Sequence, residues 1–285
     1  MKLIKNDVTK GMVFTGCSFT WGQGLYYYSN LPTLKEPGMY RYDQSLVNSA
    51  HRRYMASVRF PRLVANHFKT FEVVSENNGG RDMDSFNFLK KVFGLVPNDQ
   101  FSHYLVNDKF NFNEIEYIVF QTSQLCRNTY YYNFEGNEYE YRVHLPESYD
   151  KFYEYLSKNN LELDDVLKDL AITMFKEIKN TLQFYENLGI KTLLLHWENE
   201  YSELTENDEW MKDRLVTFEY NKTPYKSIND LMLAHRHLEI SQDYNEFTIT
   251  PEDGHPSLEC NKVIADAIIK KIEETKNKKN GPKFI

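Results

Sequence analysis

Short apolar runs alternate with helical patterns along this chain, and this alternation restricts its fold more than any other feature. Four runs are rich in Val, Ile, Leu or Phe and too short for a helix, at residues 12–15, 71–75, 115–121 and 191–196. Parallel strands need crossover connections, which helices provide. We therefore predict a doubly wound, flavodoxin-like α/β fold, with a parallel sheet of about five strands and helices on both faces.

The strongest helical pattern covers residues 163–188. Its apolar residues recur at three- and four-residue spacing, and Gly189 is the predicted stop. A second amphipathic helix is expected to follow Ser257, which can cap it. A weaker pattern spans residues 50–68, and we expect Pro61 to start a new helix there rather than kink an old one.

Three segments do not fit this alternation, and we interpret them as insertions into a single domain that spans residues 1–285. They cover residues 23–49, 128–160 and 198–246. The middle insertion is dense in Tyr and Phe, which can stack on sugar rings, form a lid, or pack as a β-hairpin cap. Residues 276–285 have the Lys, Asn and Gly composition of a flexible tail.

Composition and charge exclude several classes of function. The net charge of −7, with acidic and basic residues interspersed, leaves no broad basic surface for a nucleic acid partner. No apolar run approaches the roughly 20 residues that cross a bilayer, and MKLIKNDVTKG lacks the apolar stretch of a secretory signal. We therefore expect a cytoplasmic protein without a membrane partner, although a viral protein released by lysis would need no signal. The pattern does not indicate an oligomeric state.

The three cysteines are odd in number and lack a metal-ligand spacing, so we expect reduced thiols. His235 and His237 flank Arg236, but they do not form a metal-ligand spacing with carboxylates or thiols, and we expect no metal there.

The turn after the first predicted strand carries the first candidate for chemistry. Ligands of such sheets bind beyond the carboxyl ends of the strands, and Gly16-Cys17-Ser18-Phe19-Thr20-Trp21-Gly22 follows the first strand directly. A sharp turn there would present Ser18 at the sheet edge. A serine hydroxyl is a poor nucleophile until a base takes its proton, so a histidine partner is needed. A simple turn with Ser18 as a helix cap explains this segment equally well by itself.

The segment Pro251-Glu252-Asp253-Gly254-His255-Pro256 is the second candidate. An imidazole beside carboxylates is held in one tautomer and stabilised as imidazolium when it accepts a proton. Taken alone, the segment is typical of a surface turn. In a doubly wound sheet, however, the loop after the first strand and the loop before the last helix can meet at the carboxyl edge, so the sequence predicts a Ser18–His255 pair.

These segments resemble the conserved blocks of the SGNH/GDSL hydrolases, a superfamily of esterase- and lipase-like serine enzymes. Residues 16–22 are similar to the first block, Gly-Asp-Ser-x-Ser/Thr-x-Gly, with Cys17 in place of the Asp. Phe60-Pro61-Arg62-Leu63-Val64-Ala65 resembles the helix that often follows this block. The resemblance implies that Ser18 is the nucleophile and that His255 is the general base.

The second and third blocks of the family supply the oxyanion hole. Asn78-Gly79-Gly80-Arg81 follows the second predicted strand, and the resemblance implies a backbone N–H donor at Gly80 or otherwise at Gly79. The third block, Gly-x-Asn-Asp, has no match after the third strand. We expect its Asn to be replaced by a side chain of Gln121, Ser123 or Gln124, with Asn128 a more distant candidate. One such donor is worth about 10²- to 10³-fold in rate.

The last block of the family is Asp-x-x-His, and the chain departs from it as well. Glu252 stands three residues before His255, and Asp253 stands two before it. We favour Asp253 as the carboxylate that orients the imidazole, because shortening Asp-Gly-x-His-Pro by one residue gives Asp-Gly-His-Pro. Glu252 stays open as the alternative.

Four further residues are candidates for substrate binding: Trp21, Arg81, Arg127 and Trp197. The two arginines can bind an anionic group through their planar forks or form structural ion pairs. Trp197 ends the fourth predicted strand, where it can face the site or simply pack.

The resemblance implies hydrolysis of an ester through an acyl-enzyme, without a metal or organic cofactor. O-acetyl groups on carbohydrate are common substrates in the family, so a small-molecule or carbohydrate ester is the expected partner. Two alternatives remain: transfer of the acyl group to another alcohol by the same acyl-enzyme, and a non-catalytic binding protein that keeps the fold.

Overall fold

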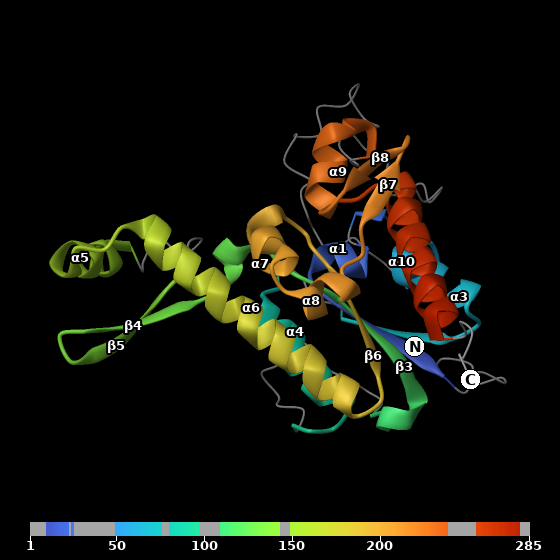
Figure 1. Ribbon diagram of the computed structural model, residues 1–285, viewed down its shortest axis with the longest axis horizontal. Helices are drawn as coiled ribbons and strands as arrows, with labels where there is room; N and C mark the ends of the chain where they lie inside the picture. The colour runs from blue at the N-terminus through green and yellow to red at the C-terminus, as the bar shows by residue number, and fades with distance from the viewer. Residues whose placement is uncertain are drawn as a thin grey trace, which may run out of the picture.

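A parallel sheet of four strands forms the centre of the chain, in the order β2-β1-β3-β6 (Figure 1). The computed structural model describes residues 10–22, 24–25, 49–75, 80–96, 109–142, 149–238 and 255–279. The strands are β1 (Gly11–Thr15), β2 (Phe71–Val74), β3 (Ile115–Gln121) and β6 (Lys191–Leu195), and all three of their pairings are parallel. The four predicted strands are therefore confirmed to within one residue.

The outer edge of β6 carries two isolated bridges instead of a further strand. Leu194 forms a parallel bridge with Leu215, and His196 forms one with Ser227. Between these two contacts the chain leaves the sheet to build a small hairpin of β7 (Phe218–Tyr220) and β8 (Thr223–Tyr225). The prediction of about five strands is thus corrected to four within the described residues.

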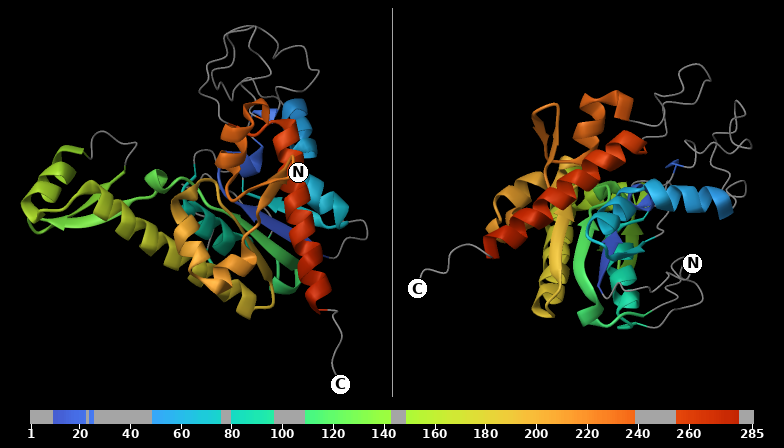
Figure 2. Two further views of the ribbon diagram at one scale, coloured as in Figure 1. Left: turned by 45° about the horizontal axis from the view of Figure 1, so that its top comes forward. Right: turned by 90° about the vertical axis from the view of Figure 1, so that its right-hand side faces the viewer.

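Helices cover both faces of the sheet, as the alternation predicted (Figure 1). The helices α4 (Asp82–Val92) and α6 (Leu163–Asn187) pack on one face, and α3 (Phe60–His67) and α10 (Leu258–Lys279) pack on the other. In the right-hand view of Figure 2, α10 crosses in front of the sheet. The sheet therefore lies between two layers of helices.

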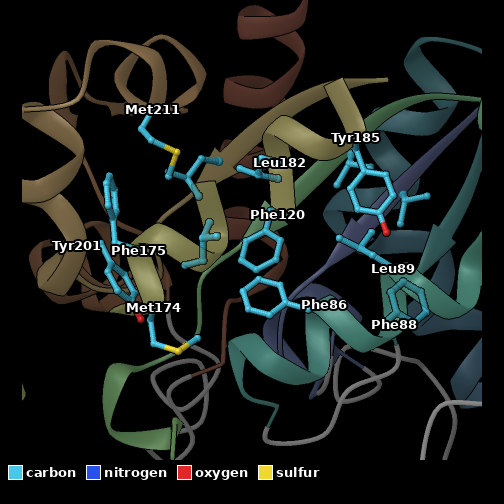
Figure 3. Close-up of a cluster of buried hydrophobic side chains, with 14 of the residues drawn as sticks. Phe86, Phe88, Leu89, Phe120, Met174, Phe175, Leu182, Tyr185, Tyr201 and Met211 are labelled. Carbon is cyan, nitrogen blue, oxygen red and sulfur yellow. The ribbon is translucent and has the colours of Figure 1, made fainter. Parts of the chain in front are cut away.

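The strand β3 divides its side chains between two hydrophobic cores, because successive residues of a strand point to opposite faces. Ile118 and Phe120 enter the core under α4 and α6, whereas Tyr117 and Val119 enter the core under α3 and α10. Phe120 stacks on Phe86 with ring centroids 5.7 Å apart (Figure 3). Burial on both faces explains why residues 117–120 of β3 are a continuous apolar run rather than an alternating one.

The predicted helix boundaries agree with the structure. The helix α6 ends before Gly189, whose φ of 87° is the left-handed conformation of a helix stop. Ser257 caps α10, with its Oγ accepting the Cys260 N–H at 3.2 Å. The predicted break at Pro61 is also present, because α2 (Ser49–Val58) ends and α3 begins there with proline in its first turn.

The end of α10 corrects one expectation. The helix continues to Lys279, so residues 276–279 of the predicted flexible tail are helical, and residues 280–285 lie outside the described part. The Lys276 ammonium lies 4.6 Å from the centroid of the Phe68 ring and 3.8 Å from a Glu116 carboxylate oxygen. These contacts fasten the last turn to the domain.

Among the helices that the structure describes, none combines the length and apolar character needed to span a membrane.

The segment after β6 builds the rest of the domain, although its pattern suggested an insertion. Its helical elements within residues 198–238 are η7 (Asn199–Tyr201), α7 (Ser202–Glu206), α8 (Glu209–Arg214), α9 (Ile228–Ala234) and η8 (Arg236–Leu238). Met211, Leu215 and Tyr201 join one core, and Phe218, Ile228 and Leu231 join the other. The shorter helices near the sheet are α1 (Ser18–Trp21), η4 (Phe112–Glu114) and η5 (Leu125–Arg127).

An aromatic arm extends from the far end of α6, as Figure 1 and the left-hand view of Figure 2 show. It consists of the antiparallel strands β4 (Tyr130–Phe134) and β5 (Asn137–Tyr141) with α5 (Tyr149–Asn159) packed on them. Phe152 is fully buried in the arm and stacks on Tyr141 at 3.7 Å. Most aromatic side chains of this segment thus fill a small core of their own, whereas Tyr131 and Tyr153 are exposed.

Phe152→Ala is expected to destabilise the arm by about 3–5 kcal/mol, because it leaves a cavity at a fully buried ring that packs against Tyr132 and Tyr141. Chemical denaturation and hydrogen exchange of the β4 and β5 amides would measure the loss. Phe184→Ala is the matched control, since that ring is 47% exposed on α6. Equal effects of the two substitutions would contradict this description of the arm.

Candidate active site

Ser18 and His255 meet at the carboxyl edge of the sheet although 237 positions separate them in the sequence. The Nε2 atom of His255 lies 3.0 Å from the Oγ atom of Ser18. Ser18 is the first residue of α1, three positions after the end of β1, and His255 stands just before α10. The structure therefore brings together the two residues that the sequence pattern predicted as a pair.

The turn after β1 owes its sharpness to two glycines. A side chain at Gly16 would lie 2.3 Å from Thr20 Oγ1 and 2.9 Å from the Cβ of Gln121, so only glycine fits. Gly22 ends α1 with a φ of 82°, and its N–H donates to the Ser18 carbonyl oxygen at 3.1 Å. These two positions fix the serine at the end of the strand.

Gln121 ties this turn to the neighbouring strand. Its amide donates to Cys17 Sγ at 3.1 Å, and its carbonyl oxygen accepts from the Thr20 hydroxyl at 2.7 Å. The residue is fully buried, so the expectation that Gln121 donates to an oxyanion is corrected: its side chain anchors the nucleophile turn. Burial raises the pKa of Cys17 to about 11, which keeps the thiol neutral beside Ser18.

Asn261 holds the histidine turn in place. Its side-chain amide donates to the carbonyl oxygens of Pro256 and Ser257 at 3.1 and 2.9 Å. Its Oδ1 accepts the Phe60 N–H at 2.9 Å, which connects the turn to α3. The turn that carries His255 is thus fastened from both sides by a fully buried side chain that the sequence analysis did not single out.

Phe19 and Trp197 are aromatic residues that pack next to the Ser18–His255 pair. Their rings stack with centroids 3.6 Å apart, and the Phe19 ring lies 4.8 Å from the His255 ring. Trp197 is only 4% exposed. The packing interpretation therefore describes Trp197 better than contact with substrate, because the ring is buried and stacks on Phe19.

The loop after β3 contains the remaining candidates for the third block. Gln124 is engaged on both sides of its amide, donating to Glu198 Oε1 at 2.8 Å and accepting from Arg127 Nε at 3.0 Å. This corrects the expectation that Gln124 donates to an oxyanion. The Ser123 hydroxyl has a longer contact, 3.4 Å to the Gln124 carbonyl oxygen. Gly80 is buried two positions before α4, and Gly79 lies outside the described residues.

The two arginines differ in their surroundings. Arg81 donates from Nε and one terminal nitrogen to both carboxylate oxygens of Asp84, at 3.2 and 3.1 Å. The ion-pair interpretation therefore describes Arg81 better than substrate binding. One terminal nitrogen of Arg127 is buried without a hydrogen-bond partner.

Several predicted positions cannot be compared with the structure. Glu252 and Asp253 lie outside the described residues, and of Trp21 only the backbone is described, within α1. The two histidines that flank Arg236 have tyrosine partners: His235 Nε2 lies 2.7 Å from the Tyr225 hydroxyl, and His237 Nε2 lies 3.1 Å from the Tyr220 hydroxyl.

Asp82 is a buried carboxylate beside the site that sequence reasoning did not identify. It is fully buried as the first residue of α4, two positions after Gly80. Its carboxylate accepts from the Ser123 N–H, the Asn128 side-chain amide and the Tyr201 hydroxyl. A signal was present in the sequence, because Asp82 directly follows the Gly-Gly-Arg segment of the second block.

Comparison with known proteins gives structural similarity at low identity. No family model and no curated protein matches the sequence. An acetyl xylan esterase, Est2A, from the rumen bacterium Butyrivibrio proteoclasticus matches 95% of this chain and 65% of its own, with a TM-score of 0.42 and 10% identity. A carbohydrate esterase, described as having divergent catalytic and non-catalytic binding functions in its active site, matches 95% of this chain and 67% of its own, with a TM-score of 0.41 and 15% identity. The chain thus spans about two thirds of the length of each.

Proposed function

We propose that this protein hydrolyses esters, with Ser18 as nucleophile and His255 as general base. The observation that carries the proposal is the 3.0 Å distance between Ser18 Oγ and His255 Nε2, which lies within the range for direct proton transfer. The motif resemblance to SGNH/GDSL hydrolases at residues 16–22 supports the same roles.

The reaction begins when Ser18 Oγ attacks the ester carbonyl carbon while His255 Nε2 accepts the hydroxyl proton. This step requires the neutral imidazole with its proton on Nδ1, so that Nε2 is free to accept. The imidazolium then gives the proton to the leaving alcohol, and an acyl-enzyme remains on Ser18. Water attacks the acyl carbonyl with His255 again as base, which releases the acid. We propose that Asp253, or otherwise Glu252, orients Nδ1.

The backbone N–H groups of Ser18 and Gly80 are the proposed oxyanion donors. Ser123 is the third proposed donor, because it lies in the loop after β3 and its hydroxyl can rotate away from its contacts with the Gln124 carbonyl oxygen and Asp82. Arg127, with one buried nitrogen unpaired, is proposed to bind an anionic group of the substrate. The expected substrate class is an O-acyl ester, with O-acetyl groups on carbohydrate as the first compounds to test.

A burst of 4-nitrophenol upon mixing with 4-nitrophenyl acetate is the expected result, because rapid acylation of Ser18 releases one equivalent before slower deacylation. Mass spectrometry of the acid-quenched protein should find the acetyl group on the Ser18 peptide. Ser75→Ala is the matched control: Ser75 is buried directly after the neighbouring strand β2, and its loss should leave the burst unchanged.

Product analysis then separates the alternatives. With glycerol present, free acetate supports hydrolysis, whereas acetylglycerol supports acyl transfer. A folded protein that gives neither a burst nor an acyl adduct would contradict the enzyme assignment and support a binding protein instead.

A further inference from the structure

The Asp82 carboxylate has no role in the reaction outlined above, yet it is fully buried at the sheet edge where the site lies. Its Oδ1 accepts the Ser123 N–H at 2.8 Å. Its Oδ2 accepts the Asn128 side-chain amide at 2.9 Å and the Tyr201 hydroxyl at 3.1 Å. The Asn128 amide oxygen in turn accepts the Asp82 N–H at 3.1 Å, so these two residues are joined twice.

These contacts join three loops at the carboxyl edge of the sheet. Asp82 follows β2, Ser123 and Asn128 follow β3, and Tyr201 follows β6. All of these side chains are at least 98% buried. Two of the loops carry proposed oxyanion donors, Gly80 and Ser123. One carboxylate thus sets the distance between the two loops on that side of Ser18.

The charge of Asp82 is unfavourable for folding, which indicates a role beyond packing. The groups that act most on this charge are neutral hydrogen-bond donors, with no cation among them, and burial raises the pKa of Asp82 to about 6. Burying a carboxylate without a counter-ion destabilises the folded state even when donors surround it. Groups with such shifted pKa values are enriched at functional sites.

We propose that Asp82 is a positioning residue for the Ser18 site: its buried carboxylate holds the loop after β3 against the Gly80 loop and so sets the geometry of the oxyanion donors. This inference rests on the proposed ester hydrolysis. Asp82 itself does not touch the substrate.

The protonation state of Asp82 determines how well it holds the loops. The ionised carboxylate accepts from all its donors, whereas the protonated acid carries an O–H where a donor already points. The other titratable groups that face it are Tyr201, Cys17 and Glu200. Burial raises the pKa of the Tyr201 hydroxyl and the Cys17 thiol, so both stay neutral below pH 8. Glu200 is exposed overall, but desolvation of its carboxylate raises its pKa to about 7.

Activity and stability should therefore respond to pH in opposite directions. The folded pKa of about 6 lies above the ordinary value of 3.8, so the folded state binds the Asp82 proton more tightly than the unfolded chain. The stability from this group is present below about pH 4 and lost as pH rises through 6. In contrast, the ionised carboxylate that holds the oxyanion donors in place forms as the pH rises over the same interval, so activity should increase there.

The experiment compares Asp82→Asn with wild type in the hydrolysis of 4-nitrophenyl acetate. We expect kcat to fall about 10- to 100-fold with KM changed less than about threefold, because misplaced donors raise the barrier without removing binding contacts. In a plot of kcat against pH, the fall in kcat at low pH that comes from protonation of Asp82 should disappear. The decrease in melting temperature between pH 4 and 6 should disappear as well. Asp84→Asn is the matched control on the same helix turn and should keep kcat within about twofold. Glu200→Gln assigns any part of the fall in kcat at low pH that comes from that neighbour.

A second measurement keeps the proposal testable if Asp82→Asn folds poorly or the wild type is inactive. Tyr201→Phe removes one donor and should lower kcat less than Asp82→Asn does. Hydrogen exchange of the Ser123 amide should be faster in either variant than in wild type at pH 7.5. Wild-type kcat in a folded Asp82→Asn protein, or an unchanged Ser123 exchange rate, would overturn the positioning role. Inactive wild type with a protected Ser123 amide that Asp82→Asn releases would contradict only the proposed hydrolysis.

Discussion

Ser18→Ala is expected to lower kcat/KM for 4-nitrophenyl acetate by at least about 10⁴-fold, because no acyl-enzyme can form without the Oγ nucleophile. Ser18 is only 4% exposed and caps no helix through its side chain, so the loss of one oxygen should leave the fold intact. Circular dichroism and the melting temperature check this. Removing Oγ also removes the 3.0 Å contact to His255 Nε2, through which the proposed mechanism transfers the serine proton.

Ser257→Ala separates this effect from a general loss of structure near the site. Ser257 stands two positions after His255 and caps α10 through its Oγ. Its replacement should cost about 1 kcal/mol of stability while activity at 25 °C stays near wild type. If Ser18→Ala retained a tenth or more of the wild-type activity, another residue would have to be the nucleophile.

His255→Ala should lower kcat/KM nearly as much as Ser18→Ala does, because the two residues act as one unit. The Ser18→Ala/His255→Ala double variant should consequently be little worse than either single variant. The remaining activity of His255→Ala should rise with hydroxide concentration, since no protein base then takes the serine proton.

Asn261→Asp should lower kcat/KM less than His255→Ala does, because it removes only the amide donor that fixes the carbonyl oxygens of Pro256 and Ser257.

Losses that added up in the double variant would contradict this account of the pair. Independent contributions from Ser18 and His255 would mean that the 3.0 Å contact is structural rather than a path for a proton.

The fold was predictable because the strands of a sheet covered on both faces have to be apolar throughout. Ile118 and Phe120 enter one core and Tyr117 and Val119 enter the other, so four successive residues of β3 are hydrophobic and the run is easy to find. The missing fifth strand was not predictable in this way. Only single bridges, at Leu215 and Ser227, extend the sheet beyond β6, and a one-residue bridge leaves no hydrophobic pattern in the sequence.

The site was predictable only where chemistry and topology act together. Ser18 and His255 carry reactive side chains at the two loops that a doubly wound sheet brings together. Asn261 and Asp82 were missed because their roles depend on partners far away in the sequence, Phe60 for the first and Tyr201 for the second. Such contacts exist only after the loops have been placed in space.

Trp197 shows what topology alone leaves open. A strand-end position indicates that a residue is near the site, but it does not say whether the ring points outward or beneath a neighbour. The stacking of Trp197 under Phe19 depends on the geometry of α1, which forms from residues 18–21.

The most direct test of the account is the site and rate of reaction with a fluorophosphonate. We predict a single adduct on Ser18 in the peptide map of the wild type, with a labelling rate at least about 100-fold lower in His255→Ala. An adduct on any other serine, no adduct on the folded protein, or an equal labelling rate in His255→Ala would contradict the assignment of Ser18 and His255 as nucleophile and base.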